Sequence, residues 1–157
     1  MGRMYTAQFN GVAATAQQDL FEIIAPSTAI VVIHDLYLGQ TTELGDAAEE
    51  QLLLLMKSGQ TTGGGFGSSP AKVPLLFGDA ASGATVAANN TTKASGGTIV
   101  THGGFCPVWN IRVPFVQIWT PECRPILAPS RRWTFELAAT PIDSITFSGS
   151  VTWEEIG

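Results

Sequence analysis

The chain has 157 residues, of which 45% are hydrophobic and 13% are charged, and its formal net charge at pH 7 is -5. That length suits a single domain that folds without a disulfide or a metal. Binding to DNA or RNA depends on Lys and Arg, so the acidic balance argues against nucleic acid as a partner. A typical domain carries about 25% charged residues, so this low fraction favours a surface partly buried against other chains.

Eight segments have the pattern of β-strands and are separated by turn-forming Gly, Pro, Asn and Ser residues. In chain order they are Met4–Asn10, Asp19–Ile24, Ala29–Leu38, Glu49–Lys57, Thr98–Phe105, Trp109–Val116, Arg131–Leu137 and Ser144–Glu154. The clearest signal lies in the last two segments, where apolar and polar residues alternate at every position from 132 to 137 and from 145 to 153. A period of two indicates half-buried strands. We expect one all-β domain over residues 1–157, a β-sandwich of jelly-roll type.

The segment Glu43–Lys57 is the one conflict in this reading. Asp46 and Glu49 have the spacing of a capping box, so a helix could continue through Leu52–Met56. Five consecutive apolar residues, however, leave no polar helical face and fit a strand covered on both sides. We favour the strand. The same run is far shorter than the roughly 20 residues of a membrane-spanning helix, so no membrane partner is expected.

Residues 58–97 form a long Gly-rich insertion, which we expect to be a functional loop or a disordered arm. Lys72–Phe77 is an apolar island within it. We expect this island to plug the sandwich, with anchoring on a neighbouring chain as the alternative. Thr85–Ala88 could add a further short strand.

Residues with metal-binding or nucleophilic chemistry are few. The soft metal ligands are His34, His102, Cys106 and Cys123. Their spacing lacks the paired C-x-x-C of a zinc site, so we predict no metal. With no apolar run at the start to serve as a secretion signal, both cysteines are expected to be reduced and buried. Neither histidine lies in a G-x-S-x-G or similar nucleophile arrangement, and Gly63–Gly67 lacks the Lys-Ser/Thr of a phosphate-binding loop.

Four glutamates could supply the paired carboxylates that glycoside cleavage needs: Glu49, Glu50, Glu154 and Glu155. Adjacent carboxylates in a strand point to opposite faces, so we interpret them as solvated charges that discourage edge-to-edge association. We therefore expect no catalytic residues, no cofactor and no enzymatic activity.

The four tryptophans fall into two groups. Trp133 and Trp153 are in phase with core positions and are predicted to be buried. Trp109 and Trp119 lie in a proline-punctuated stretch, which favours an edge or a subunit contact. An exposed aromatic there would also serve as a stacking platform for sugar rings.

Over nearly its whole length the chain resembles small structural proteins of tailed bacteriophages. The residues that carry the resemblance are Met4–Ala7 with Phe9, Asp19–Ile23 with Pro26, the Gly-rich centre, Ala87–Thr92 and the ending Thr152–Gly157. The better understood of those proteins decorate or cement the capsid as β-rich trimers. The resemblance implies a homotrimer on the capsid exterior of the virion, with the major capsid protein as its partner.

The expected function is therefore that of a non-enzymatic virion structural protein, a capsid decoration or cement protein. We expect its contact regions at Met1–Asn10 and Ser58–Gly97, because termini and long loops are free to reach neighbours. The alternatives are a head-tail connector or tail component, and a carbohydrate-binding module that uses Trp109 or Trp119.

Overall fold

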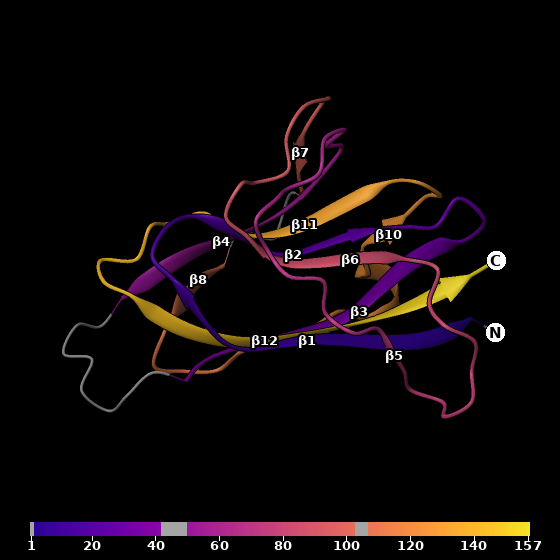
Figure 1. Cartoon of the computed structure of the whole chain (residues 1–157), viewed down its shortest axis with the longest axis horizontal. Helices are drawn as coiled ribbons and strands as arrows, with labels where there is room; N and C mark the ends of the chain where they lie inside the picture. The colour runs from indigo at the N-terminus through magenta and orange to yellow at the C-terminus, as the bar shows by residue number, and fades with distance from the viewer. Residues whose placement is uncertain (1, 42–49, 103–106) are drawn as a thin grey trace.

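The computed structural model describes residues 2–41, 50–102 and 107–157. Within these ranges the chain forms two antiparallel sheets packed face to face, so the prediction of an all-β sandwich is confirmed (Figure 1). The only helix of the described ranges is a single 3-10 turn, η1 (Pro121–Cys123). The first and last long strands pair side by side, and both chain ends lie at one end of the sandwich.

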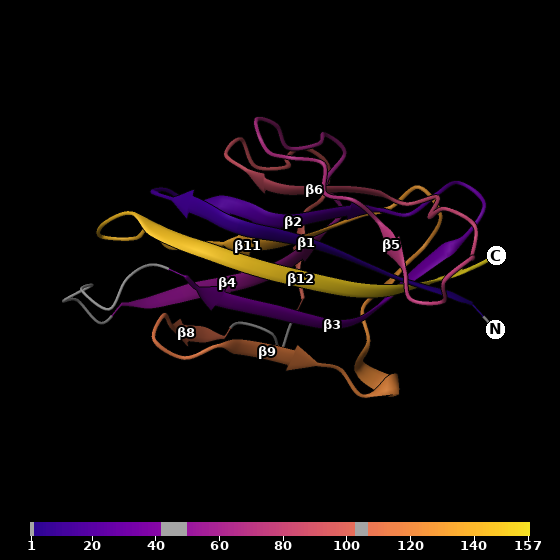
Figure 2. The same ribbon diagram turned by 60° about the horizontal axis from the view of Figure 1, so that its bottom comes forward.

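Sheet A has the order β10-β3-β12-β1-β5, and β9 also pairs with β3. The neighbours β9, β3, β12 and β1 can be followed in Figure 2. Its strands are β1 (Arg3–Ala14), β3 (Ile30–Gln40), β5 (Val73–Pro74), β9 (Phe115–Ile118), β10 (Ile126–Leu127) and β12 (Ile145–Ile156). The long pairings of β12 with β1 and β3 make the centre of this sheet.

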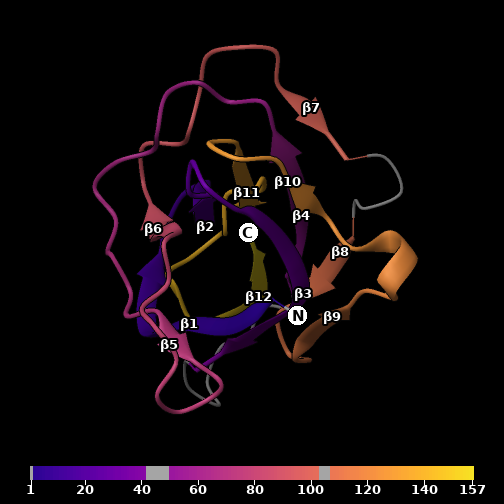
Figure 3. The same cartoon turned by 90° about the vertical axis from the view of Figure 1, so that its right-hand side faces the viewer.

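Sheet B has the order β6-β2-β11-β4-β7, and β8 also pairs with β4 (Figure 3). Its strands are β2 (Gln18–Ile24), β4 (Gln51–Ser58), β6 (Thr85–Asn90), β7 (Val100–Thr101), β8 (Val108–Asn110) and β11 (Arg132–Leu137). The strand expected in Glu43–Lys57 is confirmed as β4, while residues 42–49 lie outside the described residues. Leu52, Leu54 and Met56 of β4 face the core.

The stretch Trp109–Val116 is not one strand, as predicted, but two. Val113 N donates to Asn110 O at 3.1 Å and Arg112 N donates to the Asn110 side chain at 3.0 Å. An asparagine that bonds its own backbone two residues on makes a turn, and this one carries the chain from β8 in sheet B to β9 in sheet A.

Three further short strands differ from the prediction. The strand expected over Thr98–Phe105 is limited in the described residues to β7, and residues 103–106 lie outside them. The two-residue strands β5 and β10 were not predicted. Both are too short to show an alternating pattern, so only their pairing with β1 and β3 reveals them.

The core lies between the two sheets and is rich in aromatic residues. Trp133 and Trp153 are buried, as predicted. The ring centroids of Tyr5 and Trp153 are 5.9 Å apart, and those of Phe9 and Phe21 are 5.1 Å apart. The first pair lies within sheet A and the second joins β1 of sheet A to β2 of sheet B, so the apolar half of the alternating pattern is confirmed as core.

In sheet B, the polar residues of the alternating pattern are buried as well as the apolar ones. On β11, Thr134 and Glu136 are buried, although alternation predicts a solvated face. Residues 60–68 and 91–96, which we call the covering segment, lie over this outer face and pair with each other through the bridges Thr62–Ser95 and Gly65–Thr92. The expected short strand at Thr85–Ala88 is confirmed as β6, which pairs with β2. The insertion is therefore largely built into the sandwich.

Candidate functional site

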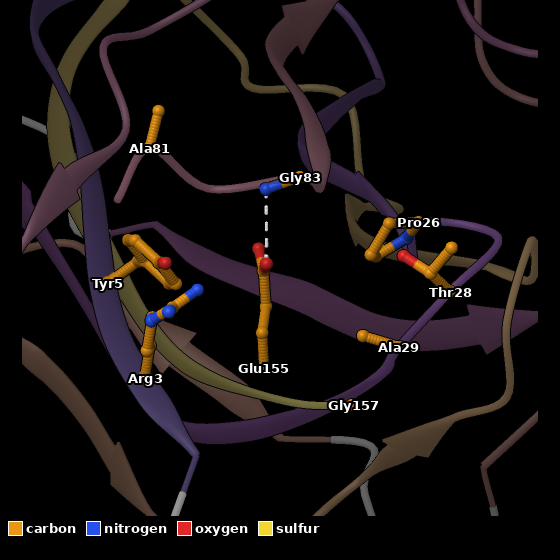
Figure 4. Close-up of a pocket in the computed structure, with 9 residues that line it drawn as sticks. All are labelled: Arg3, Tyr5, Pro26, Thr28, Ala29, Ala81, Gly83, Glu155 and Gly157. Carbon is orange, nitrogen blue, oxygen red and sulfur yellow. Dashed lines mark hydrogen bonds between the residues drawn. The ribbon is translucent and has the colours of Figure 1, made fainter. Parts of the chain in front are cut away.

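A cavity of about 390 Å³ opens at the end of the sandwich where both termini emerge; we call it the end cavity (Figure 4). Its wall consists of the start of β1, the end of β12, the β2–β3 turn and the loop before β6. The polar side chains among its lining residues are Arg3, Tyr5, Thr28 and Glu155. The open end of a sandwich is a common place for a binding site, so this cavity is a candidate.

The Glu155 carboxylate is held by four donors. Gly83 N, Ala84 N and Trp153 Nε1 donate to it at 3.0, 3.1 and 3.2 Å, and the Ser82 hydroxyl donates as well. Burial raises the pKa of Glu155, but these hydrogen bonds outweigh burial and hold the pKa below its usual value. Glu155 is therefore ionised and occupied as an acceptor, and it ties the loop before β6 to the end of β12.

The Tyr5 hydroxyl donates to Ala80 O at 3.0 Å, on the same loop. Burial and the nearby Glu155 charge raise the pKa of Tyr5, so this phenol stays protonated at neutral pH. A fixed carboxylate and a fixed phenol hold the loop in place, and neither is poised to transfer a proton. The arrangement suits binding of a small polar group beside Arg3 more than it suits a reaction.

A second group of polar residues lies beneath the covering segment. The Arg132 guanidinium donates to Glu22 at 2.6 Å, and Asn90 Nδ2 and Gly64 N donate to the other oxygen of Glu22 at 2.7 and 2.9 Å. Arg132 also donates to Gln60 O at 3.0 Å. A buried carboxylate needs such partners, so this cluster fastens the covering segment to sheet B.

The same cluster continues toward the end of β11. Glu136 accepts from Lys93 at 2.9 Å and also pairs with Lys57. Ala94 N donates to Asp19 Oδ2 at 2.7 Å. Burial raises the pKa of Asp19 to about 6, and the charges of Glu136 and Glu22 act in the same direction. Sequence reasoning missed these acids, although charged residues inside a strand flanked by apolar ones were a readable signal.

The structure does not bring together the three soft ligands within the described residues, His34, His102 and Cys123. His34 Nε2 lies 3.3 Å from Glu154, and His102 lies elsewhere, beside a cavity under β10. Cys123 is exposed in η1, so the prediction that it is buried is wrong: the 3-10 turn places it outside both sheets. Cys106 lies outside the described residues. No group of three or more His, Cys, Asp or Glu in the described ranges is arranged to hold a metal ion.

Of the four glutamates considered as paired carboxylates, the three within the described residues, Glu50, Glu154 and Glu155, all accept hydrogen bonds rather than facing only solvent. Glu50 is buried and accepts from Ile142 N at 3.0 and 3.1 Å, which contradicts its expected exposure. Glu154 accepts from Gly2 N at 2.9 Å. Glu49 lies outside the described residues. Backbone donors at strand ends explain the difference, because unpaired N–H groups there need acceptors.

Trp109 and Trp119 are both buried, so neither forms the exposed platform that sugar stacking requires. The Trp109 indole donates to Val113 O, and its ring packs 5.2 Å from that of Phe147, measured between centroids. Trp109 does lie on a short strand at the edge of β4, as its proline-rich context predicted.

Several large apolar side chains on loops are exposed. The expectation that Lys72–Phe77 plugs the sandwich is wrong: Leu75 and Leu76 are 57% and 66% exposed, and Phe77 is fully exposed. Leu75–Phe77 is called the apolar loop below. Phe66, between the bridged residues Gly65 and Ser68 of the covering segment, is 89% exposed and was not singled out from the sequence. Its signal was an aromatic residue flanked by glycines, which offer it nothing to pack against.

Comparison with known proteins identifies no relative. No family model matches the chain, and no curated protein or solved structure is similar to it at a significant level. No helix of the described ranges is long and apolar enough to cross a membrane.

Proposed function

We propose that this chain is a non-enzymatic structural protein that works by binding other proteins through its loops, as a decoration or cement protein on a bacteriophage head. The observation that carries the proposal is the exposure of Phe66 and Phe77 on loops that project from a closed sandwich. Contiguous exposed apolar side chains mark interaction surfaces, and Phe77 belongs to such a run, Leu75–Phe77. The phage assignment itself rests on the sequence resemblance described above.

The strand order supports a jelly-roll version of the sandwich. The neighbours β1-β12-β3-β9 in one sheet and β2-β11-β4-β8 in the other follow the arrangement of a double Greek key. In the first half of the chain the connections β1–β2, β2–β3 and β3–β4 each cross between the sheets. Such a fold offers a rigid body with loops at both ends, which suits a surface protein that touches several neighbours.

The mechanism requires no chemistry. A protein that binds only the expanded shell stabilises that shell by mass action. A homotrimer on a threefold axis would contact several copies of the major capsid protein at once, so individually weak loop contacts add up. Phe66 suits this contact, because its side chain is exposed while Gly65 and Ser68 on either side of it are held by backbone bridges.

The test measures binding of the purified protein to expanded, undecorated capsids, together with the number of copies bound. Hundreds of copies per particle support decoration, a dozen or fewer indicate a connector or tail component, and none contradicts a capsid role. Phe66→Asn is the informative variant, because the residue has a φ of 61°, which Asn tolerates. We expect a loss of at least tenfold in shell affinity with folding intact. Deleting residues 63–69 is a poorer test, since it removes the Gly64 contact with Glu22.

A further inference from the structure

We infer that copies of this chain associate head to tail, with the apolar loop of one copy docked in the cavity beneath β10 of the next. The inference rests on the proposed function only in requiring self-association. It needs no capsid.

The apolar loop is a preformed projection. Val73 and Pro74 pair with β1, Leu75 N donates to Met4 O at 2.9 Å, and Asp79 N donates to Leu76 O at 3.1 Å. The first contacts tie the start of the loop to β1 and the last bond closes a turn within it, yet its side chains remain exposed. A rigid loop with an exposed aromatic residue loses little conformational entropy on binding, which favours its use as an anchor.

The receiving site is a cavity of about 300 Å³, called the edge cavity, between the two sheets. Pro125, Ile126 and Leu127 form its sheet A side, and Gly59, His102 and Trp133 form its other side. Ile126 is 65% exposed, although it is a large aliphatic residue. This combination of apolar walls and an exposed apolar rim suits a leucine or phenylalanine side chain.

Two residues that line this cavity each carry a buried ring nitrogen without a hydrogen-bonding partner. Trp133 Nε1 and His102 Nε2 have no hydrogen-bonding partner. Burial lowers the pKa of His102, so its ring is neutral at pH 7. The indole N–H can only donate. A carbonyl of an inserted loop would be an ordinary acceptor for it, and an inserted aromatic ring would be a weak one.

The loop cannot fill the edge cavity of its own copy. The strands β5 and β10 form opposite edges of sheet A and lie on different sides of the molecule (Figure 3). Four strand spacings separate them, which is about 19 Å. A second copy is therefore the occupant that the chain itself provides. Charge agrees, because Asp79 follows the apolar loop and Arg131 lines the edge cavity.

A contact between two different surfaces of the same chain is heterologous. Such contacts close into a ring when the rotation between copies allows it, and otherwise continue as a filament. A closed ring of three agrees with the proposed homotrimer. Each copy would then contribute its apolar loop to one neighbour and its edge cavity to the other.

The test disables the apolar loop and the edge cavity in separate variants. Phe77→Asp disables the loop and Ile126→Asp disables the cavity rim, and both replaced side chains are exposed, so folding should persist. Ile126→Ser is a milder second variant in case the charge disturbs β10. By light scattering we expect a trimer for the wild type and a monomer for each variant. An equimolar mixture of the two variants should form a dimer and stop there, because only one intact loop and one intact cavity can meet.

Ile142→Asn is the matched control, since it removes an apolar side chain that is 83% exposed on another loop and should leave the mass unchanged. A monomeric wild type, a variant that keeps the wild-type mass, or a mixture that fails to pair would overturn the inference. Shell binding is scored separately. A trimer that ignores capsids would reject only the capsid role, and a monomer that saturates capsids would reject only the head-to-tail contact.

Discussion

Within the insertion at residues 58–97, the polar part is packed against the sandwich and the apolar part is exposed, which is the reverse of what their compositions suggest. The covering segment is rich in Gly, Ser and Thr, yet it lies against sheet B and is tied to Glu22 and Asp19. The apolar loop is made of Leu and Phe, yet it is exposed. Burial in this protein therefore follows the partners that the fold supplies rather than the hydropathy of the segment.

The physical reason lies in the outer face of sheet B. Buried carboxylates and guanidinium groups need hydrogen-bond partners, and a glycine-rich backbone can approach closely enough to provide them. The apolar loop meets no such surface in its own copy. Its backbone is anchored at its base, through Leu75 N to Met4 O, while its side chains stay exposed.

The largest expected effect comes from breaking the cluster that holds the covering segment. Glu22→Ala leaves the Arg132 guanidinium largely buried and without its carboxylate. We expect the free energy of unfolding to fall by about 3–5 kcal/mol, measured by urea titration. Asp143→Ala, which removes an exposed carboxylate, should change it by less than about 0.5 kcal/mol. Equal small losses in both variants would mean that the covering segment contributes little.

Asp19 makes the same region sensitive to pH. Its pKa is about 6 in the folded protein and 3.8 when unperturbed, so between these values the folded state binds more protons. Stability from this group is therefore present below pH 4 and is lost as pH rises through 6. We expect Asp19→Asn to remove roughly 2–3 kcal/mol of that pH dependence. The check is urea unfolding of both proteins at pH 4, 5 and 7; parallel curves would contradict the buried acid.

Substitutions at two nearby glycines, Gly65 and Gly67, test whether the covering segment packs closely against β6. A Cβ at Gly67 would lie 2.3 Å from Asn90 Oδ1 and 2.4 Å from Ala88 O, whereas one at Gly65 would meet nothing within 4 Å. Gly67→Ala should lower the free energy of unfolding by about 1–3 kcal/mol because the covering segment must move away from β6. Gly65→Ala should be neutral within about 0.5 kcal/mol. Thermal unfolding of the pair decides the matter, and equal melting temperatures would argue against close packing.

The smallest effect is expected at the apolar loop. Phe77→Ser removes a fully exposed side chain, so the stability of a single copy should change by less than about 0.5 kcal/mol. At high protein concentration the wild type alone should gain stability through association. Unfolding measured at two concentrations tests both statements. A large loss at the lower concentration would show that the loop packs within its own copy.

Much of the fold was predictable from local pattern. The alternation in residues 145–153 correctly placed Ile145, Phe147 and Trp153 in the core, and the unbroken apolar run of β4 indicated a strand. The division of Trp109–Val116 into two strands was not predicted, because an asparagine turn competes with a sequence that otherwise has strand composition.

The candidate sites were less predictable than the fold. The end cavity joins Tyr5 and Glu155, which are far apart in the chain, and the pattern gives no sign of their meeting. Trp109 and Trp119 were reasonable candidates for exposure, but the paired sheets bury them. A site assembled from the ends of several strands depends on register, which composition does not encode.

The sequence by itself determined that this protein is an all-β chain with aromatic side chains in its core, since a period of two is a local property of each strand. Only the tertiary structure decided that the polar face of sheet B is covered, that the apolar loop is exposed and that the edge cavity lies at the opposite edge of sheet A from that loop. Those features depend on contacts between distant residues, such as Glu22 with Gly64 and Asn90, and long-range pairing is set by the whole fold.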